Sequence, residues 1–412
     1  MTHHPHTREF DLVVFGATGF TGRLVAEYLH LSGADGARWA MAGRSLDKLG
    51  RVRDELHLPP SVALLKADAG DPASMKALVA RTRVVITTVG PYQLHGEALA
   101  TACAEGGTDY VDLCGEPLWM ARMIDKLTPL ARRSGARIVF SCGFDSIPFD
   151  LGVVYLQAEA QARFGAPLPE VRGRVARLKG GASGGTLASM METLEAIRRE
   201  PALVKVMVNP FSLAEGFKGP KQPHGQDADF DDWADAWTGP FVMATINTKN
   251  IHRSNALRGH PWGEGLVYSE KMLTGKPGQG DKGRKKAHAL ARFTRLQNLA
   301  LGFTPTRALL RRFVLTQPGD GPDAAAREAG RYEVWFTGQS AGGERLRAIV
   351  KGDRDPGYGS TCKLISEAAL CLLRDVGREA TPGGVWTPGS ALGLALVRRL
   401  QARAGLTFEI AA

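Results

Sequence analysis

The feature that most constrains the fold is a glycine-spaced turn between an apolar run and a helical pattern. Residues 10–15 form a largely apolar run, the pattern of a buried strand. Gly16, Gly19 and Gly22 follow at three-residue spacing, and helical periodicity continues after them. Strand, glycine turn and helix start together form a cradle for a dinucleotide pyrophosphate, because free N–H groups and the positive helix end face the phosphates. A plain strand–turn–helix corner is the alternative, and the position after the first strand favours the cradle.

The residue that would meet the adenosine ribose indicates which dinucleotide is bound. The second predicted strand ends at Gly43, and Arg44 and Ser45 follow it. An acidic residue here would accept hydrogen bonds from a free 2′-hydroxyl, whereas the planar guanidinium of Arg44 suits a 2′-phosphate. The sequence therefore predicts NADP(H) rather than NAD(H). Ser45 also has the position of a helix N-cap, and Arg44 that of a solvated strand end.

Further buried strands end at Asp68, at Gly90-Pro91-Tyr92 and just before Asp145. Their alternation with helical segments predicts an α/β fold with a Rossmann-type, doubly wound parallel sheet. Ligands of such sheets lie beyond the carboxyl ends of the strands. The predicted cofactor-binding residues are Gly16, Thr18, Gly19, Phe20, Thr21, Gly22, Arg44, Ser45, Asp68, Gly90 and Pro91. The same edge is predicted to carry Tyr92, His95, Cys114, Glu116, Cys142, Asp145 and Ser146.

The length of 412 residues exceeds one ordinary dinucleotide domain, so two domains are expected. Residues 1–150 are predicted to form the NADP-binding domain. The second domain, 151–354, opens with a new strand–turn–helix unit, and its turn is predicted to face the substrate cleft. Residues 209–239 are rich in Gly, Pro and Asp and predict a long surface loop. The alternation within 331–352 predicts two antiparallel strands.

The composition indicates a globular protein in a reducing, cytoplasmic location. The hydrophobic fraction is 44% and the charged fraction 23%. No apolar run reaches the roughly 18 residues that a membrane-spanning helix needs. The five cysteines are odd in number and show no CxxC pairing, which predicts free thiols. No cluster of metal-ligand residues appears in the pattern, so no metal site is predicted.

The net charge of +10 is unevenly distributed, with a basic stretch between residues 282 and 312. Its basic side chains include those of the KGRKK run at 282–286 and of Arg292, Arg295, Arg307, Arg311 and Arg312. A basic amphipathic surface for a membrane, a CoA phosphate or an acidic carrier protein is one interpretation. A solvated helix face is the other. Nucleic acid is excluded as a partner, because no recognisable binding module or interleaved aromatic pattern is present.

Motifs along nearly the whole chain resemble those of the saccharopine dehydrogenase-like oxidoreductases. The resemblance is carried by GATGFTG (16–22), AGRS (42–45), TTVGPY (87–92), YVDLCGE (110–116), GFDSIPFDLG (143–152), SGGTLAS (183–189), INTKNIHRSNAL (246–257), GYGST (357–361) and GGVWTPGSALG (383–393). Within this family the sequence is most similar to trans-acting enoyl reductases of polyketide-lipid biosynthesis and to lipid-associated members. The resemblance implies a Rossmann domain and a second α/β domain for substrate and dimerisation, with 355–412 returning to the first. It also implies NADP(H), an acyl substrate and a homodimer.

Reduction of an enoyl thioester needs hydride at the β-carbon, a proton at the α-carbon and a hydrogen-bond donor at the thioester oxygen. None of the seven tyrosines has a lysine four residues later, which disfavours the short-chain-dehydrogenase mechanism. Tyr92 and His95 after the fourth strand, and Asp145 after the sixth, are the candidate catalytic residues. A capping role for Asp145 and a surface role for His95 are the alternatives. Tyr358 is a further candidate from the second domain.

Three functions therefore compete. The first is NADPH-dependent reduction of an enoyl or related acyl thioester, free or bound to a carrier protein. The second is saccharopine-type chemistry on an imine or secondary amine, which would need a cationic clamp for carboxylates. Arg172, Arg174, Arg177 and Lys179 could supply that clamp, although alternation on a strand sends half of them away from any one side. The third is a non-catalytic NADP-binding protein that adsorbs to a membrane surface through the basic stretch.

Overall fold

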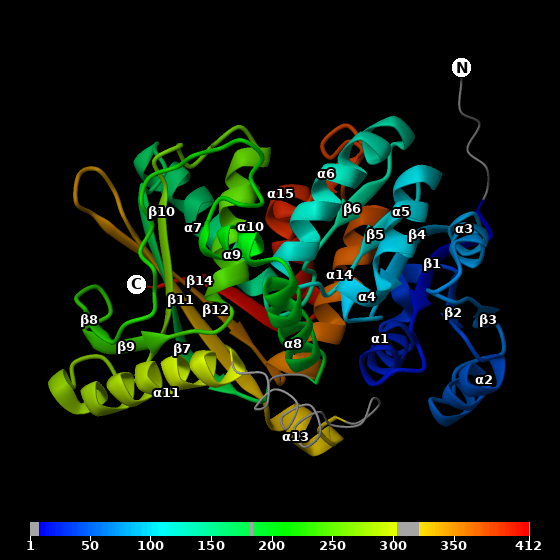
Figure 1. Cartoon of the computed structure of the whole chain (residues 1–412), viewed down its shortest axis with the longest axis horizontal. Helices are drawn as coiled ribbons and strands as arrows, with labels where there is room; N and C mark the ends of the chain where they lie inside the picture. Colours follow the sequence, from blue (N-terminus) through cyan, green and yellow to red (C-terminus); the bar gives the residue numbers. More distant parts are fainter. Residues whose placement is uncertain (1–7, 182–183, 303–320, 412) are drawn as a thin grey trace.

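Two seven-stranded sheets with helices around them form the computed structural model, which describes residues 8–181, 184–302 and 321–411 (Figure 1). The first sheet has the order β13-β6-β5-β4-β1-β2-β3, and all its pairings are parallel. Its strands are β1 (Phe10–Phe15), β2 (Trp39–Gly43), β3 (Ala63–Lys66), β4 (Thr82–Thr87), β5 (Asp109–Val111), β6 (Arg137–Val139) and β13 (Gly384–Trp386). The order reverses between β1 and β4, which confirms the predicted doubly wound sheet and places its switch point there.

The strands of the first sheet are continuously apolar because helices cover both faces. Its helices are α1 (Phe20–Leu31), α2 (Leu46–Glu55), α3 (Pro72–Val79), α4 (Tyr92–His95), α5 (Glu97–Gly106), α6 (Pro117–Ser134) and α14 (Thr361–Arg374). Leu12 and Val14 of β1 belong to the core that includes α1 and α14. Val13 and Phe15 point to the opposite face and belong to the core that includes α3, α5 and α6.

The second sheet is mixed, with the order β14-β12-β11-β7-β10-β9-β8. Only the β7–β10 pairing is parallel. Its strands are β7 (Glu170–Lys179), β8 (Asp229–Asp231), β9 (Ala236–Pro240), β10 (Val267–Leu273), β11 (Arg331–Gln339), β12 (Arg345–Gly352) and β14 (Leu406–Ile410). The antiparallel β11–β12 pair confirms the strands predicted within 331–352. The prediction of a loop over 209–239 was wrong at its end, where β8 and β9 pair with each other.

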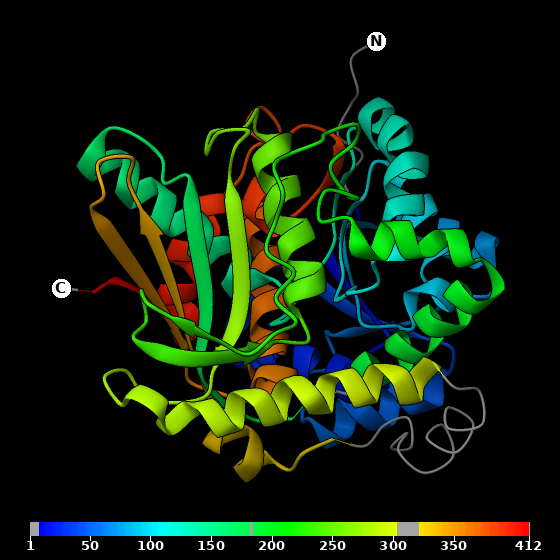
Figure 2. The same ribbon diagram turned by 60° about the vertical axis from the view of Figure 1, so that its left-hand side comes forward.

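The helices around the second sheet include two that border the cleft described below, α8 and α10. The set comprises α7 (Ile147–Phe164), α8 (Gly184–Arg199), α9 (Val204–Val208), α10 (Ala244–Leu257), α11 (Arg284–Gly302), α13 (Ala324–Ala329), α15 (Pro388–Ala391) and α16 (Gly393–Arg403). Figure 2 shows α11 running along the lower edge of this sheet, where it packs against β9. Among the helices of the described residues, none is long and apolar enough to cross a membrane.

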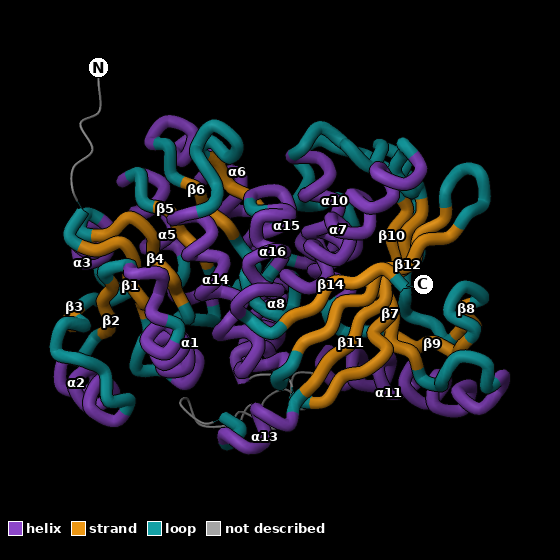
Figure 3. Tube along the Cα trace, turned by 180° about the vertical axis from the view of Figure 1, so that it is seen from behind, coloured by secondary structure: helices purple, strands orange, loops and turns teal. Residues whose placement is uncertain are grey.

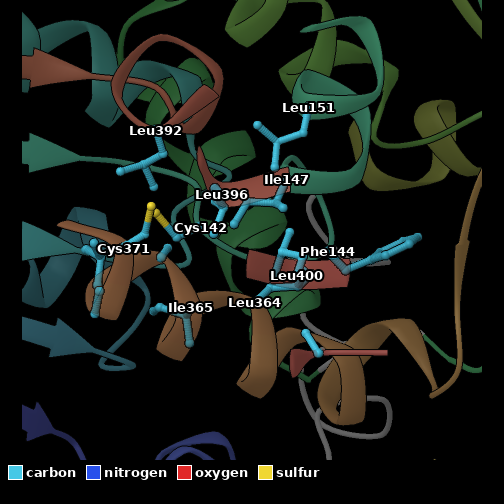
Figure 4. Close-up of a cluster of buried hydrophobic side chains, with 14 of the residues drawn as sticks. Cys142, Phe144, Ile147, Leu151, Leu364, Ile365, Cys371, Leu392, Leu396 and Leu400 are labelled. Carbon is cyan, nitrogen blue, oxygen red and sulfur yellow. The ribbon is translucent and has the colours of Figure 1, made fainter. Parts of the chain in front are cut away.

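Helices α7, α14 and α16 form the core between the two sheets (Figure 3). Apolar side chains from these helices meet there with Cys142 and Phe144, which follow β6 (Figure 4). The C-terminal segment contributes to both halves, because β13 pairs with β6 and β14 pairs with β12. The predicted domain boundaries at residues 150 and 355 stay a prediction, since strands after residue 355 enter each sheet.

Candidate active site

A cleft of about 1430 Å³ lies at the carboxyl edge of the first sheet. Residues that follow β1, β2, β4, β5 and β6 line one side of it, and α8 and the start of α10 line the other. Ten of the eleven predicted cofactor residues and all three predicted catalytic residues are in contact with this cavity. The ten are Gly16, Thr18, Gly19, Phe20, Thr21, Gly22, Arg44, Asp68, Gly90 and Pro91, and Ser45 is the one that does not line it.

The glycine loop has the close backbone approach that a dinucleotide cradle requires. Gly16 has φ +90°, a conformation that favours glycine. A Cβ on Gly22 would lie 2.2 Å from the carbonyl oxygen of Gly16, so α1 can pack this tightly on the loop only with glycine at that position. The Gly19 amide donates to the Gly16 carbonyl, and the N-terminus of α1, from Phe20 onward, opens into the cleft with the unpaired N–H groups of a helix start. These features fit a bound pyrophosphate and favour the cradle over a plain corner.

The two residues predicted at the ribose have different roles. The Ser45 hydroxyl accepts a hydrogen bond from the Lys48 amide at 3.3 Å, so Ser45 is the N-cap of α2. Arg44 is exposed at the end of β2 and lines the cleft. Its guanidinium has no hydrogen-bond or ion-pair partner among the described residues, which leaves its donors available to a phosphate. Asp68 closes a turn by accepting from the Gly70 amide at 3.0 Å.

The turn at Gly90-Pro91 is held by a carboxylate that sequence reasoning placed at the mouth without a role. Glu116 is fully buried, and its two carboxylate oxygens accept hydrogen bonds from the amides of Tyr92 and Gln93, each at 2.8 Å. These amides begin α4, so Glu116 satisfies two N–H groups that a helix start leaves unpaired. The Gly90-Pro91 peptide is cis.

The three predicted catalytic residues have different environments in the structure. Tyr92 is 5% exposed, and its hydroxyl donates to the Thr87 carbonyl at 3.2 Å and accepts from the Leu113 amide at 2.9 Å. Burial raises the pKa of the Tyr92 phenol well above its ordinary value, with the Asp112 carboxylate adding to the effect. The hydroxyl proton of Tyr92 is thus used in the hydrogen bond to the Thr87 carbonyl within the wall of the cleft. His95 is exposed at the end of α4 and lines the cleft.

Asp145 lines the cleft just before α7. Burial raises the pKa of its carboxyl to about 6. The capping role considered from the sequence is absent, because no hydrogen bond or ion pair to this carboxylate is formed within the described part of the chain. Asp145 therefore presents to the cavity a carboxyl group whose raised pKa, about 6, lies near neutral pH.

The next residue, Ser146, is the first member of a buried polar network. Its hydroxyl donates to Asn247 at 3.3 Å and accepts from Asn250 at 2.9 Å, both on α10. Asn247 donates in turn to Glu270 at 2.7 Å, and Tyr268 donates to the other oxygen of Glu270 at 2.6 Å. Burial raises the pKa of Glu270 to about 7. Sequence reasoning missed these α10 residues, although asparagines within an otherwise buried helical stretch, INTKN, were a signal.

The far wall of the cleft is mainly apolar. Helix α8 is joined to the first domain by Ser189, whose hydroxyl donates to Glu116 at 2.6 Å, and by Gly184, whose amide donates to the Tyr358 hydroxyl at 3.1 Å. The ring of Tyr358 also packs edge-on against Phe20 at 4.8 Å between centroids. Side chains that give this wall its apolar character are Met190, Leu194, Ile197, Met207, Phe241, Val242, Met243 and Ile246.

The predicted cationic clamp does not reach the cleft. Arg172 and Arg174 form ion pairs with Asp231, at 3.4 and 2.5 Å. Arg177 and Lys179 are exposed on β7, and none of the four lines the cavity. Among the described lining residues, Arg44 is the one arginine or lysine, and it lies at the end of β2. The apolar compartment thus has no cationic partner for a substrate carboxylate in the described structure.

Metal and thiol chemistry find no support in the described residues. No three His, Cys, Asp or Glu side chains in those ranges are grouped to hold a metal ion. All five cysteines are buried and unpaired. Cys114 lines the cavity, and burial together with the Asp112 and Glu116 carboxylates raises the pKa of its thiol well above the ordinary value. A reactive thiolate is therefore absent from this wall.

A glycine-loop cradle at the switch point of a parallel sheet, open to a substrate-sized cleft, defines a dinucleotide-dependent oxidoreductase. Residues 12–139 match the model of the saccharopine dehydrogenase NADP-binding domain. A Mycobacterium tuberculosis (strain H37Rv) relative, provisionally named a trans-acting enoyl reductase, is 39% identical over 420 residues, which cover 98% of this chain and 97% of that one. The trans-acting enoyl reductase of Mycobacterium bovis (strain BCG) is 37% identical over 415 residues, covering 96% of each chain.

The chain thus belongs to the saccharopine dehydrogenase NADP-binding family and is a trans-acting enoyl reductase-like, NADP-binding oxidoreductase. The family predicted from the sequence motifs is confirmed. The solved structure of saccharopine dehydrogenase (L-Glu forming) from Saccharomyces cerevisiae matches 98% of this chain and 100% of its own with a TM-score of 0.53. Its 13% sequence identity makes this a likeness of fold.

Proposed function

We propose that this protein reduces the carbon–carbon double bond of an enoyl thioester with NADPH. The observation that carries the proposal is the composition of the cleft. Its glycine-loop end fits a dinucleotide, and the adjoining compartment is walled by apolar side chains such as Met190, Leu194 and Ile197. Transfer of an acyl chain from water to such a wall is favourable. The carboxylates of an amino-acid substrate, by contrast, would have no cationic partner there.

The cofactor would be held by the glycine loop at its pyrophosphate and by Arg44 at its 2′-phosphate. When bound, NADPH supplies the hydride that the β-carbon of the enoyl group receives. The Gly90-Pro91 turn, fixed by Glu116, would border the nicotinamide half of the cofactor, because it follows β4 at the switch point.

The proton for the α-carbon would come from Asp145. Its carboxyl lines the cavity and has a pKa raised to about 6, so a protonated fraction exists near neutral pH. Transfer of this proton leaves a carboxylate that takes a proton from water to complete the cycle. Tyr92 is not assigned this role, because its hydroxyl proton is held by the Thr87 carbonyl.

The substrate would reach the cleft on a carrier protein. Exposed basic side chains of α11, among them Lys285, Lys286 and Arg292, lie on the helix whose Thr294 lines the cavity. Their charge complements an acidic carrier. Arg307, Arg311 and Arg312 of the predicted basic stretch lie outside the described residues. Membrane contact and the homodimer stay predictions.

The test is NADPH oxidation by the purified protein with enoyl thioesters of increasing chain length. We expect turnover that rises with chain length and that is much slower with NADH. Leu194→Asp should remove the preference for long chains and leave NADPH binding unchanged, while the matched change Leu31→Asp, at a side chain 77% exposed on α1, should alter neither.

Three results would contradict the proposal in different ways. Turnover of an imine formed from a 2-oxo acid and an amino acid, without turnover of thioesters, would favour saccharopine-type chemistry. NADPH binding without turnover of either substrate would favour the non-catalytic alternative. Equal turnover of short and long thioesters would show that the apolar wall does not hold the acyl chain.

A further inference from the structure

We propose that Glu116 is a positioning residue that connects the cofactor turn to the substrate helix α8, so that α8 becomes fixed when NADPH binds. The inference rests on the proposed function for the identity of the two ligands. Its structural basis is a single buried carboxylate that contacts both halves of the cleft. Neither the sequence pattern nor the family likeness assigns this residue a role.

The hydrogen bonds of Glu116 divide between the two domains. One oxygen accepts from the Tyr92 amide at 2.8 Å and from the Ser189 hydroxyl at 2.6 Å, and the other accepts from the Gln93 amide at 2.8 Å. Tyr92 and Gln93 directly follow the Gly90-Pro91 turn, whereas Ser189 lies on α8. Glu116 is 0% exposed, so its carboxylate depends on these protein donors for its hydrogen bonds. A buried carboxylate that loses a donor is costly, and the two sides are therefore coupled.

A second contact one helical turn along α8 strengthens the connection. The side-chain amide of Gln93 donates to the Thr193 hydroxyl at 3.0 Å, and that hydroxyl donates to the Ser189 carbonyl at 2.9 Å. Ser189 and Thr193 are four residues apart and so lie on the same face of the helix. Both line the cavity, next to Met190 and Leu194. A shift of the turn would consequently move the apolar wall of the substrate compartment.

Few other contacts in the described structure join α8 to the side of the cleft that would hold the cofactor. Helix α8 packs against α4 of the first domain and against α11 and the residues that follow α8. Its first turn is held separately, because the Gly184 amide donates to the hydroxyl of Tyr358, which lies just before α14. The Glu116 and Gln93 contacts thus hold the middle of α8, where the lining residues are. Ordering of the Gly90-Pro91 turn by NADPH would reduce the opening motions of this part of the helix.

Hydrogen exchange of the α8 amides from 188 to 199, with and without NADPH, tests the inference without a substrate. We expect NADPH to slow exchange in the intact protein. Ser189→Ala removes the contact between Glu116 and α8 and leaves both α4 amides paired, so NADPH should still bind within about twofold of the original affinity while most of the protection of α8 is lost. Glu116→Gln should weaken NADPH binding as well, because its amide group opposes a donor. Thr193→Val should show a smaller loss of protection.

Ser366→Ala is the matched control, since this buried serine donates only to the Cys362 carbonyl of its own helix. It should keep the protection of α8. With an enoyl thioester as substrate, Ser189→Ala should raise KM about tenfold, the effect expected for a lost hydrogen bond to a charged group. Protection of α8 that persists in Ser189→Ala, or exchange that NADPH does not change in the intact protein, would overturn the inference. Absence of thioester reduction would contradict the proposed function, and the hydrogen-exchange result would still decide whether Glu116 couples the turn to α8.

Discussion

The Asp145 carboxyl gives the cleft a titratable group whose ionisation can be followed in the rate. Its pKa is raised to about 6 by burial, and the protonated form is the proton donor. We therefore expect kcat to be highest below about pH 6 and to fall as the pH rises through that value. Asp145→Asn should lower kcat by about 10²- to 10⁴-fold and remove this pH dependence, with NADPH binding unchanged. Steady-state rates across a pH series provide the measurement.

His95→Gln serves as the comparison, because His95 lines the same cavity from the exposed end of α4. It should retain the pH profile of the intact protein. If the profile follows His95 rather than Asp145, the proton donor is misassigned.

At the scale of single residues, the sequence predicted the positions of the cofactor loop but not the use of each side chain. Gly16 and Gly22 were predictable because their role depends on local backbone geometry. The hydrogen bonds of the Tyr92 hydroxyl were not predictable, because they involve the Thr87 carbonyl and the Leu113 amide, which lies 21 residues away. The contact between Glu116 and Ser189 spans 73 residues, and no local pattern indicates it.

At the scale of elements, the packing of α1 on the glycine loop allows a direct test. Gly22→Ala would place a Cβ 2.2 Å from the Gly16 carbonyl oxygen, so α1 must move away from the loop. We expect NADPH affinity to fall by about 100-fold and stability to fall by about 1–3 kcal/mol, as for other overpacked sites. Nucleotide titration and thermal unfolding measure the two effects.

The control for this prediction is Gly50→Ala within α2, where a Cβ would meet nothing within 4 Å. Alanine in a helix is favoured over glycine by about 1 kcal/mol, so this variant should be slightly more stable and should bind NADPH normally. Equal effects of the two changes would show that the tight packing at Gly22 is not what matters.

Elements with a strong local pattern were predictable, and elements that depend on a distant partner were not. The run at 10–15 is apolar throughout because both faces of β1 are covered, and this alone identifies a buried strand. By contrast, β8 and β9 are short and lie in a stretch rich in turn-forming residues. They pair through Phe230 opposite Trp237, and β9 also pairs with β10, which begins some thirty residues later.

At the scale of the whole molecule, the buried polar network between α10 and the second sheet predicts a pH-dependent stability. Burial raises the pKa of Glu270 to about 7 in the folded chain, so the stabilisation from its protonated form is complete below its ordinary pKa and is lost as pH rises through about 7. Glu270→Gln should therefore gain stability relative to the intact protein between pH 4.5 and 8, by on the order of 3 kcal/mol. Urea unfolding of both proteins across this range is the measurement, and a constant difference would contradict the prediction.

The arrangement of the two sheets was only partly predictable. The Rossmann-type sheet follows from strands and helices that alternate along the first 140 residues. The positions of the edge strands β13 and β14 could not be predicted in this way. Strand β13 pairs with β6, some 245 residues earlier in the chain, and β14 pairs with β12 although helices lie between them in the sequence. The sequence of these short segments contains no information on which edge they join.

The placement of β13 and β14 bears on how the protein is made. Each sheet receives an outermost strand from the short segment 384–410. During synthesis β13 and β14 leave the ribosome after the other strands of the described sheets, so each sheet reaches its final width only after its edge strand has been made. A nascent chain that stalls before residue 384 would leave one edge of each sheet unpaired, because the same short segment, 384–410, completes both sheets.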